Sequence, residues 1–289
     1  MKNTRATIHA VVTAAISLLA SSQLFANETP SSERVVSAGS AVTELLLELD
    51  AKDSLVAIDV TSQLPKGMEL PKVGYHRRLS AEGLLALRPT KVIGSDEMGP
   101  KTALNQLKAA GVDVEIVNTD ANVEGLYQRI DQIANLMNRQ AKAEDLKQDV
   151  KAQVQELNAN QPAQAQKKKV LFLLIHEGRP ANVAGSETTP DAIIQLAGGR
   201  NPAADQLSSY KPLSTEAMVE MQPDVILVSG RSYETLGGAD AILKAMPLLA
   251  ATPAGMNKNI ITIDGHALVG GLGLKSLVEA ERLNALLYP

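Results

Sequence analysis

The chain has 289 residues, with 28 lysines and arginines against 32 aspartates and glutamates, so its formal net charge at pH 7 is −4. An acidic protein is a poor partner for nucleic acid, and we expect no such partner. Cysteine is absent, which excludes disulfide bonds and thiolate metal sites. Tryptophan is absent as well, and two phenylalanines and five tyrosines are too few for a large aromatic cage around a ligand.

Residues 1–26 have the pattern of a secretory signal peptide. Lys2 and Arg5 precede an apolar stretch over 8–19, and small and polar residues then lead to Ala26, after which we expect cleavage. An N-terminal membrane anchor is the alternative interpretation. No later segment approaches the ~20 apolar residues needed to cross a bilayer, so we expect an exported protein with no membrane span in the mature chain.

Residues 27–121 are expected to form an N-terminal lobe in which strands alternate with helices. Apolar runs predict the strands, and apolar residues at helical spacing predict the helices between them. The expected elements are a strand at 34–37, a helix with apolar residues at 42, 45, 46 and 49, a strand at 55–60, a helix at 101–110 and a strand at 112–117. Such alternation is typical of α/β proteins with parallel strands.

Residues 122–158 are expected to form a helical linker. Apolar residues recur at helical spacing from 123 to 137, a break is expected near 138–140, and a second apolar run continues to 157. A helix of roughly 18 residues is about 27 Å long. That length is enough for one long backbone helix to join two lobes.

Residues 159–289 are expected to form a C-terminal lobe on the same plan. Its apolar run Val170–Ile175 predicts a buried strand. The elements expected after it are a loop at 176–186, a helix at 190–196, a loop at 229–239, a helix at 239–245, a strand at 260–263 and a terminal helix at 274–287.

A fifteen-residue pattern occurs twice and relates the two lobes. Leu79–Ile93 recurs 134 residues later as Leu213–Leu227, with four identical positions and five more that pair two apolar residues. Each copy predicts a serine-capped short helix with an acidic residue in its first turn, a proline that ends it, and an apolar strand. We therefore predict an α/β protein of two similar lobes with mainly parallel sheets and a ligand cleft between the lobes.

Three stretches carry a resemblance to a known family: Val73–Leu85, Leu171–His176 with Val183-Ala184-Gly185, and Gly237–Gly255. With the two-lobe pattern, they resemble the periplasmic substrate-binding proteins of ABC importers that have one helical backbone and bind cobalamin, siderophores or haem, and the haem-binding members in particular. The resemblance implies a binding protein and no enzyme, which captures haem in the periplasm and delivers it to an ABC permease dimer at the inner membrane. The chain departs from the family at Gly271–Lys275, where Gly-Phe-Gly-Pro-Arg is common, so the family's ligand contact there is not carried over.

The resemblance also implies the residues that hold the ligand. Tyr75 is implied as the ligand of the haem iron, and some family members use a histidine at the position of His176. Haem iron accepts both tyrosinate and histidine. A free tyrosine has a pKa of about 10, so binding to Fe(III) must displace the phenolic proton, and nearby Arg77, Arg78 or Arg231 favours the anion. Arg231 further resembles a family arginine that hydrogen-bonds the ligating phenolate. One haem or two stacked haems can occupy such a cleft.

Each of these residues also has an interpretation without a ligand. Tyr75 can simply pack within its glycine-bearing loop, His176 can be a structural histidine at the end of a strand, and Arg231 can be solvated. His76 and His266 are both expected at the surface.

Glu82 and Glu216 occupy matched positions in the two copies of the repeat. In the family, glutamates at these positions meet arginines of the two permease subunits, so the resemblance implies that both residues dock the permease. An acidic residue in the first turn of a helix is also favoured by the helix dipole, by about 0.3–1 kcal/mol when exposed. The helix dipole explains either glutamate alone, but it does not explain why both occupy the same position in the two copies of the repeat.

Two other functions stay open. The same fold can bind a ferric siderophore or cobalamin, although siderophore sites of this architecture tend to use tryptophans, which this chain lacks. A metal chelatase built of two α/β lobes is the enzyme alternative, but the sequence shows no paired carboxylates or His/Asp cluster at useful spacing.

Overall fold

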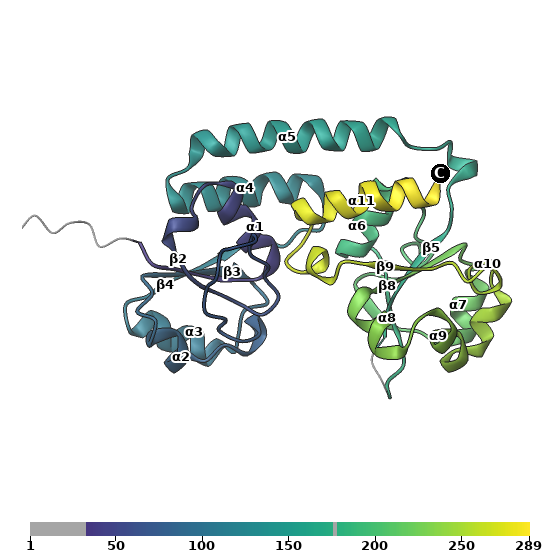
Figure 1. Ribbon diagram of the computed structural model, residues 1–289, viewed down its shortest axis with the longest axis horizontal. Coiled ribbons are helices and arrows are strands. Elements are labelled where there is room, and N and C mark those ends of the chain that lie inside the picture. The colour runs from purple at the N-terminus through teal and green to yellow at the C-terminus, as the bar shows by residue number, and fades with distance from the viewer. Residues whose placement is uncertain (1–32, 176–177) are drawn as a thin grey trace, which may run out of the picture. The chain divides into compact units, whose positions relative to one another are not determined.

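The computed structural model describes residues 33–175 and 178–289, and the chain from Glu33 onward forms one compact unit (Figure 1). The predicted signal peptide, residues 1–26, lies outside the described residues, as does His176. Within the two described ranges, no helix has the length and apolar character that crossing a membrane requires. The lobe boundaries near residues 121 and 158 stay predictions, because the contacts from Glu33 onward define a single unit.

The first sheet consists of four parallel strands in the order β2-β1-β3-β4. These strands are β1 (Val35–Ala38), β2 (Leu55–Ile58), β3 (Lys91–Ser95) and β4 (Asp113–Val117). The residues of β1 are all buried, as expected of a central parallel strand. The connections contain helices α1 (Ser40–Glu48), α2 (Ala81–Leu85) and α3 (Lys101–Ala109) and the 3₁₀ turns η1 (Lys52–Ser54) and η2 (His76–Arg78).

The predicted helical linker is a pair of helices, α4 (Val123–Met137) and α5 (Gln140–Ala159). Asn138 ends α4 in the left-handed conformation, with φ 54°, which breaks the helix at the predicted position. α4 and α5 pack against each other, and α5 also packs against α6 (Thr189–Leu196) and α11 (Leu274–Leu287). The long backbone helix that connects elements of both lobes is therefore α5, whose 20 residues span about 30 Å (Figure 1).

The second sheet has five strands in the order β7-β6-β5-β8-β9. Strands β5 (Val170–Leu174), β8 (Val225–Ser229) and β9 (Ile260–Ile263) are parallel, and β6 (Asn182–Ala184) and β7 (Tyr210–Pro212) extend the sheet in antiparallel fashion. The other elements after α5 are η3 (Gln164–Gln166), α7 (Thr215–Glu220), α8 (Gly230–Leu236), α9 (Ala239–Ala245), η4 (Pro247–Ala251), α10 (Pro253–Met256) and η5 (Gly265–Leu268).

Helix α8 occupies the segment 229–239 that the sequence pattern predicts as a loop. The Ser229 hydroxyl accepts a hydrogen bond from the Ser232 N–H at 3.2 Å, and Gly237 ends the helix with φ 93°. The loop prediction is wrong because a serine N-cap and a left-handed glycine define a short helix here, although its apolar pattern is weak.

The sequence repeat is also a repeat of backbone conformation. Ser80 and Ser214 each accept a hydrogen bond from the backbone N–H three residues ahead, at 3.2 and 3.3 Å. Arg88 and Gln222, each followed by a proline, both adopt positive φ angles, 49° and 47°. These shared features confirm that α2 leads into β3 by the same path as α7 leads into β8.

A junction between α1 and the start of α11 connects the N-terminal lobe to the C-terminal segment. The Glu44 carboxylate accepts hydrogen bonds from the backbone N–H groups of Leu274 and Lys275, at 2.7 and 3.2 Å. Fully buried Arg129 of α4 donates to the backbone oxygens of Asn118 and Leu272. Burial raises the pKa of Glu44 to about 7 and lowers the pKa of Arg129 to about 10.

Gly273 permits this junction. A Cβ atom at position 273 would lie 2.1 Å from Oε1 of Glu44, so only glycine lets the carboxylate approach the first N–H groups of α11. A helix N-terminus favours a carboxylate through its unpaired N–H groups and its dipole.

Candidate functional site

Tyr75 lies in the connection between β2 and α2, immediately before η2. Tyr75 is 40% exposed, more than any other tyrosine of the described residues. Gly74, with φ 88°, precedes Tyr75, and the Gly74 carbonyl accepts a hydrogen bond from the Val60 N–H at 2.9 Å. The Tyr75 carbonyl accepts from the Arg78 N–H at 2.7 Å. The loop is thus held by its own backbone while the phenol remains accessible.

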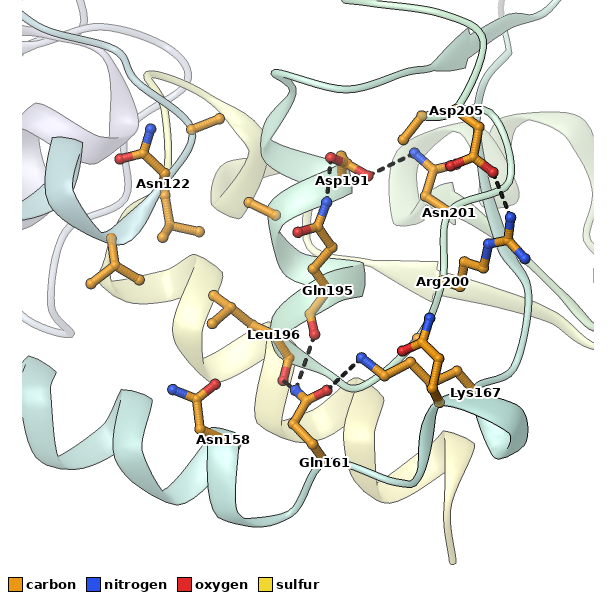
Figure 2. A pocket seen from close by; sticks show the side chains of 17 residues that line it. Asn122, Asn158, Gln161, Lys167, Asp191, Gln195, Leu196, Arg200, Asn201 and Asp205 are labelled. Carbon is orange, nitrogen blue, oxygen red and sulfur yellow. Dashed lines mark hydrogen bonds and ion pairs between the residues drawn. The ribbon is translucent and has the colours of Figure 1, made fainter.

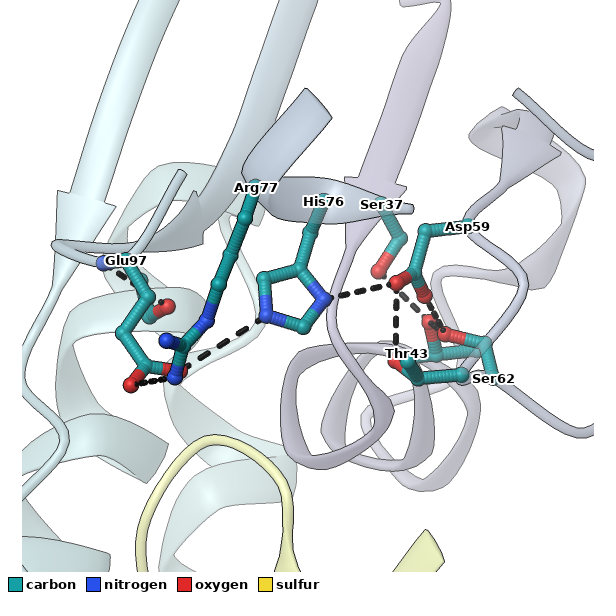
Figure 3. A network of polar contacts seen from close by, with 9 residues as sticks. Ser37, Thr43, Asp59, Ser62, His76, Arg77 and Glu97 are labelled. Atoms are coloured by element: carbon teal, nitrogen blue, oxygen red, sulfur yellow. Dashed lines mark hydrogen bonds and ion pairs between the residues drawn. The ribbon is translucent and has the colours of Figure 1, made fainter. Parts of the chain in front are cut away.

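His76 is buried, with 1% of its surface exposed, so the expectation of a surface position is wrong. Its Nδ1 donates to Oδ2 of Asp59 at 2.9 Å, since a carboxylate can only accept, and its Nε2 lies 3.6 Å from Oε2 of Glu97 (Figure 3). The two carboxylates come from different connections, which sequence spacing could not reveal. His266, the other histidine expected at the surface, is partly exposed.

Charges of alternating sign follow one another from Asp59 through His76 and Glu97 to Arg77. Burial acts to lower the pKa of His76, but Asp59 and Glu97 outweigh it and hold that pKa above its ordinary value. His76, followed by Arg77, keeps the pKa of Glu97 below its ordinary value, against the effect of burial. Arg77 forms an ion pair with Glu97, and this pair raises the pKa of Arg77 although desolvation opposes it. Arg77 therefore presents a fixed positive charge beside Tyr75.

Tyr210 is a further tyrosine near Glu97 and Arg77 that the sequence interpretation did not single out. It lies on β7 of the second sheet, is 36% exposed, and packs its ring edge-on against Phe172, with centroids 6.4 Å apart. Desolvation raises the pKa of Tyr210, the Glu97 carboxylate raises it further, and Arg77 lowers it. Tyr210, in the C-terminal lobe, therefore lies close enough to Glu97 and Arg77 for their charges to affect its pKa. Tyr210 is in no motif, so only the fold connects it to the site.

The other predicted site residues lie on several elements. Arg231 is exposed on α8, near the end of β8, and not on a loop. Glu82 and Glu216 are exposed in the first turns of α2 and α7. Of the residues predicted around the iron, the structure brings Tyr75 and Arg77 together; His176 lies outside the described residues.

A pocket of about 630 Å³ lies elsewhere, among the start of α4, the end of α5 and α6 (Figure 2). Its polar side chains bind one another: Gln195 donates to Asp191 at 2.8 Å, and Arg200 pairs with Asp205 at 2.6 Å. Asn201 also donates to Asp191, at 3.0 Å. Such a polar and internally paired lining is unsuited to a flat apolar ligand. Tyr75 is not among the residues that line this pocket, and we do not assign the ligand to it.

The chain matches the family model of periplasmic binding proteins over residues 35–267, and it belongs to that family. Among solved structures it is similar to the periplasmic heme-binding protein HutB of Vibrio cholerae, with 62% identity and a TM-score of 0.85 over 90% of this chain and 100% of that chain. It is also similar to the periplasmic heme-binding protein BhuT in complex with two hemes, with 38% identity and a TM-score of 0.79 over 88% and 97% of the two chains.

A more distant relative is the vitamin B12-binding protein of Vibrio parahaemolyticus, 27% identical over 213 residues, which are 73% of this chain and 75% of that protein. The family and these similarities confirm the predicted α/β fold of two lobes with mainly parallel sheets, in the class whose ligand cleft lies between the lobes. They also confirm the prediction of a periplasmic binding protein in place of an enzyme.

Proposed function

We propose that this chain captures haem in the periplasm and delivers it to an ABC permease dimer at the inner membrane, as part of iron uptake. The observation that carries the proposal is the accessible phenol of Tyr75, beside the charge of Arg77, in a chain that is 62% identical to a heme-binding protein over 90% of its length. The predicted signal peptide, residues 1–26, would direct export, and the periplasmic relatives support that assignment.

Haem presents a flat apolar ring, two carboxylates and an iron atom with free axial positions. Tyr75 would supply an anionic oxygen ligand to Fe(III), and Arg77 would stabilise the phenolate once its proton has left. Arg231 would contact the ligating group or a haem carboxylate from the C-terminal lobe. Cation and phenolate together suit ferric haem, whose iron favours anionic oxygen.

His176 would add a nitrogen ligand, either to the same iron or to a second haem. The similarity to BhuT in complex with two hemes supports the second arrangement. The two arrangements differ in stoichiometry and in the coordination of the iron, so a titration separates them.

Titration of the purified mature protein with hemin, cyanocobalamin and a ferric siderophore tests the function. We expect saturation by hemin at one or two equivalents with a change in the visible spectrum, and no saturation by the other two ligands at the same concentrations. Cobalamin is the second candidate because of the vitamin B12-binding relative. Binding of cobalamin without binding of hemin would contradict the proposal.

We further propose that Glu82 and Glu216 dock the permease, because both are exposed at matched positions of repeated elements. An exposed ion pair contributes up to about 1 kcal/mol, so the double variant Glu82→Ala with Glu216→Ala should weaken docking by up to about 30-fold. Part of the salt dependence of docking should disappear with it. Haem uptake by the reconstituted transporter measures the effect on docking, and hemin titration of the free protein measures the effect on ligand affinity.

The exposed Glu156 of α5 provides a matched control, and Glu156→Ala should leave uptake unchanged. Normal uptake by the double variant would return both glutamates to the role of helix-dipole partners. A loss of hemin affinity in the double variant would mean that these residues line the ligand site instead.

A further inference from the structure

His76 is the buried member of an otherwise accessible segment. Tyr75 before it is 40% exposed and the side chain of Arg77 after it is 52% exposed, whereas His76 is 1% exposed. Burying an imidazole between two carboxylates contributes little net stability, because desolvation offsets the attraction. Such an arrangement is better explained by the geometry that it enforces.

We propose that His76 is a positioning residue for the haem ligand: it fixes the direction of the Tyr75 side chain and of the Arg77 guanidinium before haem arrives. The inference rests on the proposed haem-binding function and deepens it. The rings of Tyr75 and His76 have centroids 4.4 Å apart and planes inclined at 58°, so the buried imidazole restricts where the exposed phenol can lie.

One side of the imidazole is anchored to the first sheet. Asp59, which accepts from Nδ1 of His76, also accepts from the hydroxyls of Thr61 and Ser62, both at 2.7 Å. Ser62 continues through Thr43 of α1 to Ser37 of β1, again with oxygen atoms 2.7 Å apart at each step (Figure 3). A chain of side-chain hydrogen bonds therefore connects the central strand β1 to His76, the residue that follows Tyr75.

The other side of the imidazole is linked to Arg77. Glu97, from the connection after β3, lies 3.6 Å from Nε2 of His76 and pairs with the guanidinium. Backbone hydrogen bonds join the same two segments. The His76 carbonyl accepts from the Gly99 N–H at 3.0 Å, and the Gly99 carbonyl accepts from the Leu79 N–H at 2.7 Å. The segment that carries Tyr75 and Arg77 is thus held by one unit of hydrogen bonds and ion pairs around His76.

Preorganisation of this kind acts on ligand affinity, because a site that is already ordered loses less conformational freedom on binding. His76→Gln keeps a side-chain donor for Asp59 but removes the ring beside Tyr75 and the link to Glu97. We expect His76→Gln to bind hemin about tenfold more weakly and to release it about tenfold faster. At saturating hemin, its phenolate-to-iron absorption should be weaker or broader than that of the wild type, because Tyr75 no longer holds one direction.

Asn201→Ala is the matched control, since Asn201 is also buried and hydrogen-bonded, with bonds to Ala184 and Asp191 in the C-terminal lobe. The control should lose stability and keep the wild-type hemin affinity and spectrum. If His76→Gln loses stability but keeps affinity and spectrum, His76 is merely structural and the inference is overturned. If the wild type itself does not bind hemin, the result contradicts the proposed function, and not only the role of His76.

A second variant keeps the test decisive should His76→Gln fail to fold. Glu97→Gln acts on the same unit from a partly exposed side chain and leaves the bond between His76 and Asp59 intact. We expect Glu97→Gln to produce the same spectral broadening, with a smaller loss of affinity of about threefold. An unchanged spectrum and affinity in Glu97→Gln would likewise overturn the inference.

Discussion

Tyr75→Phe should weaken hemin binding by about 100-fold, which corresponds to about 2.7 kcal/mol, and should remove the phenolate-to-iron absorption from the visible spectrum. The change deletes only the oxygen that would coordinate the iron, so the contacts of the aromatic ring with porphyrin and with His76 remain. Tyr75→Ala removes those contacts as well and should have the largest effect of any single substitution. Absorbance titration with hemin measures both losses.

Tyr127→Phe is the control for loss of a tyrosine hydroxyl, since Tyr127 is half-buried on α4, away from the Tyr75 loop. It should titrate like the wild type. An unchanged affinity and spectrum in Tyr75→Phe would contradict the assignment of Tyr75 as the iron ligand, and the search for the ligand would move to His176 and Tyr210.

Glu44→Gln should change the pH dependence of folding stability by about 3 kcal/mol. The pKa of Glu44 is about 7 in the folded protein, against an ordinary 4.5, so the folded state binds this proton more tightly than the unfolded state. The stabilisation is fully present below pH 4.5 and is lost as the pH rises through 7. Glutamine does not titrate, so the free energy of unfolding of Glu44→Gln should rise relative to that of the wild type between pH 5 and pH 8.

Urea unfolding of both proteins at pH 5 and pH 8 gives the four free energies of unfolding that this comparison needs. Glu48→Gln is the control, because Glu48 belongs to the same helix but is exposed. Glu48→Gln removes a carboxylate from the same helix and leaves the junction with α11 intact. A pH-independent difference for Glu44→Gln would show that the carboxylate is already ionised at pH 5 in the folded protein.

Local patterns in the sequence predict most of the fold. Apolar runs identify the parallel strands, and the serine, glutamate and proline of the repeat identify α2 and α7. These signals lie within a few residues of the elements that they define. Helix α8 is the exception, because its signal consists only of one cap at each end, and its weak apolar pattern predicts a loop.

The site could be predicted only in part, because its contacts connect distant segments. The resemblance pointed to Tyr75 and Arg77, which the structure brings together, but their roles stay predictions. Nothing near His76 in the sequence indicates Asp59, 17 residues before it, as its partner. Tyr210 lies on an antiparallel strand that belongs to the second sheet alone, so the repeat gives no counterpart for it.

The junction of Glu44 with the start of α11 joins residues 230 positions apart. Closing so long a segment of chain loses more conformational entropy than pairing neighbouring strands, and contacts of this kind tend to slow folding. We therefore expect each sheet to form before α11 meets α1, so that assembly ends where the two lobes are fastened together. Before α11 packs against α1, the Glu44 carboxylate is still hydrated, and the part of α1 that α11 covers in the folded protein is exposed to solvent.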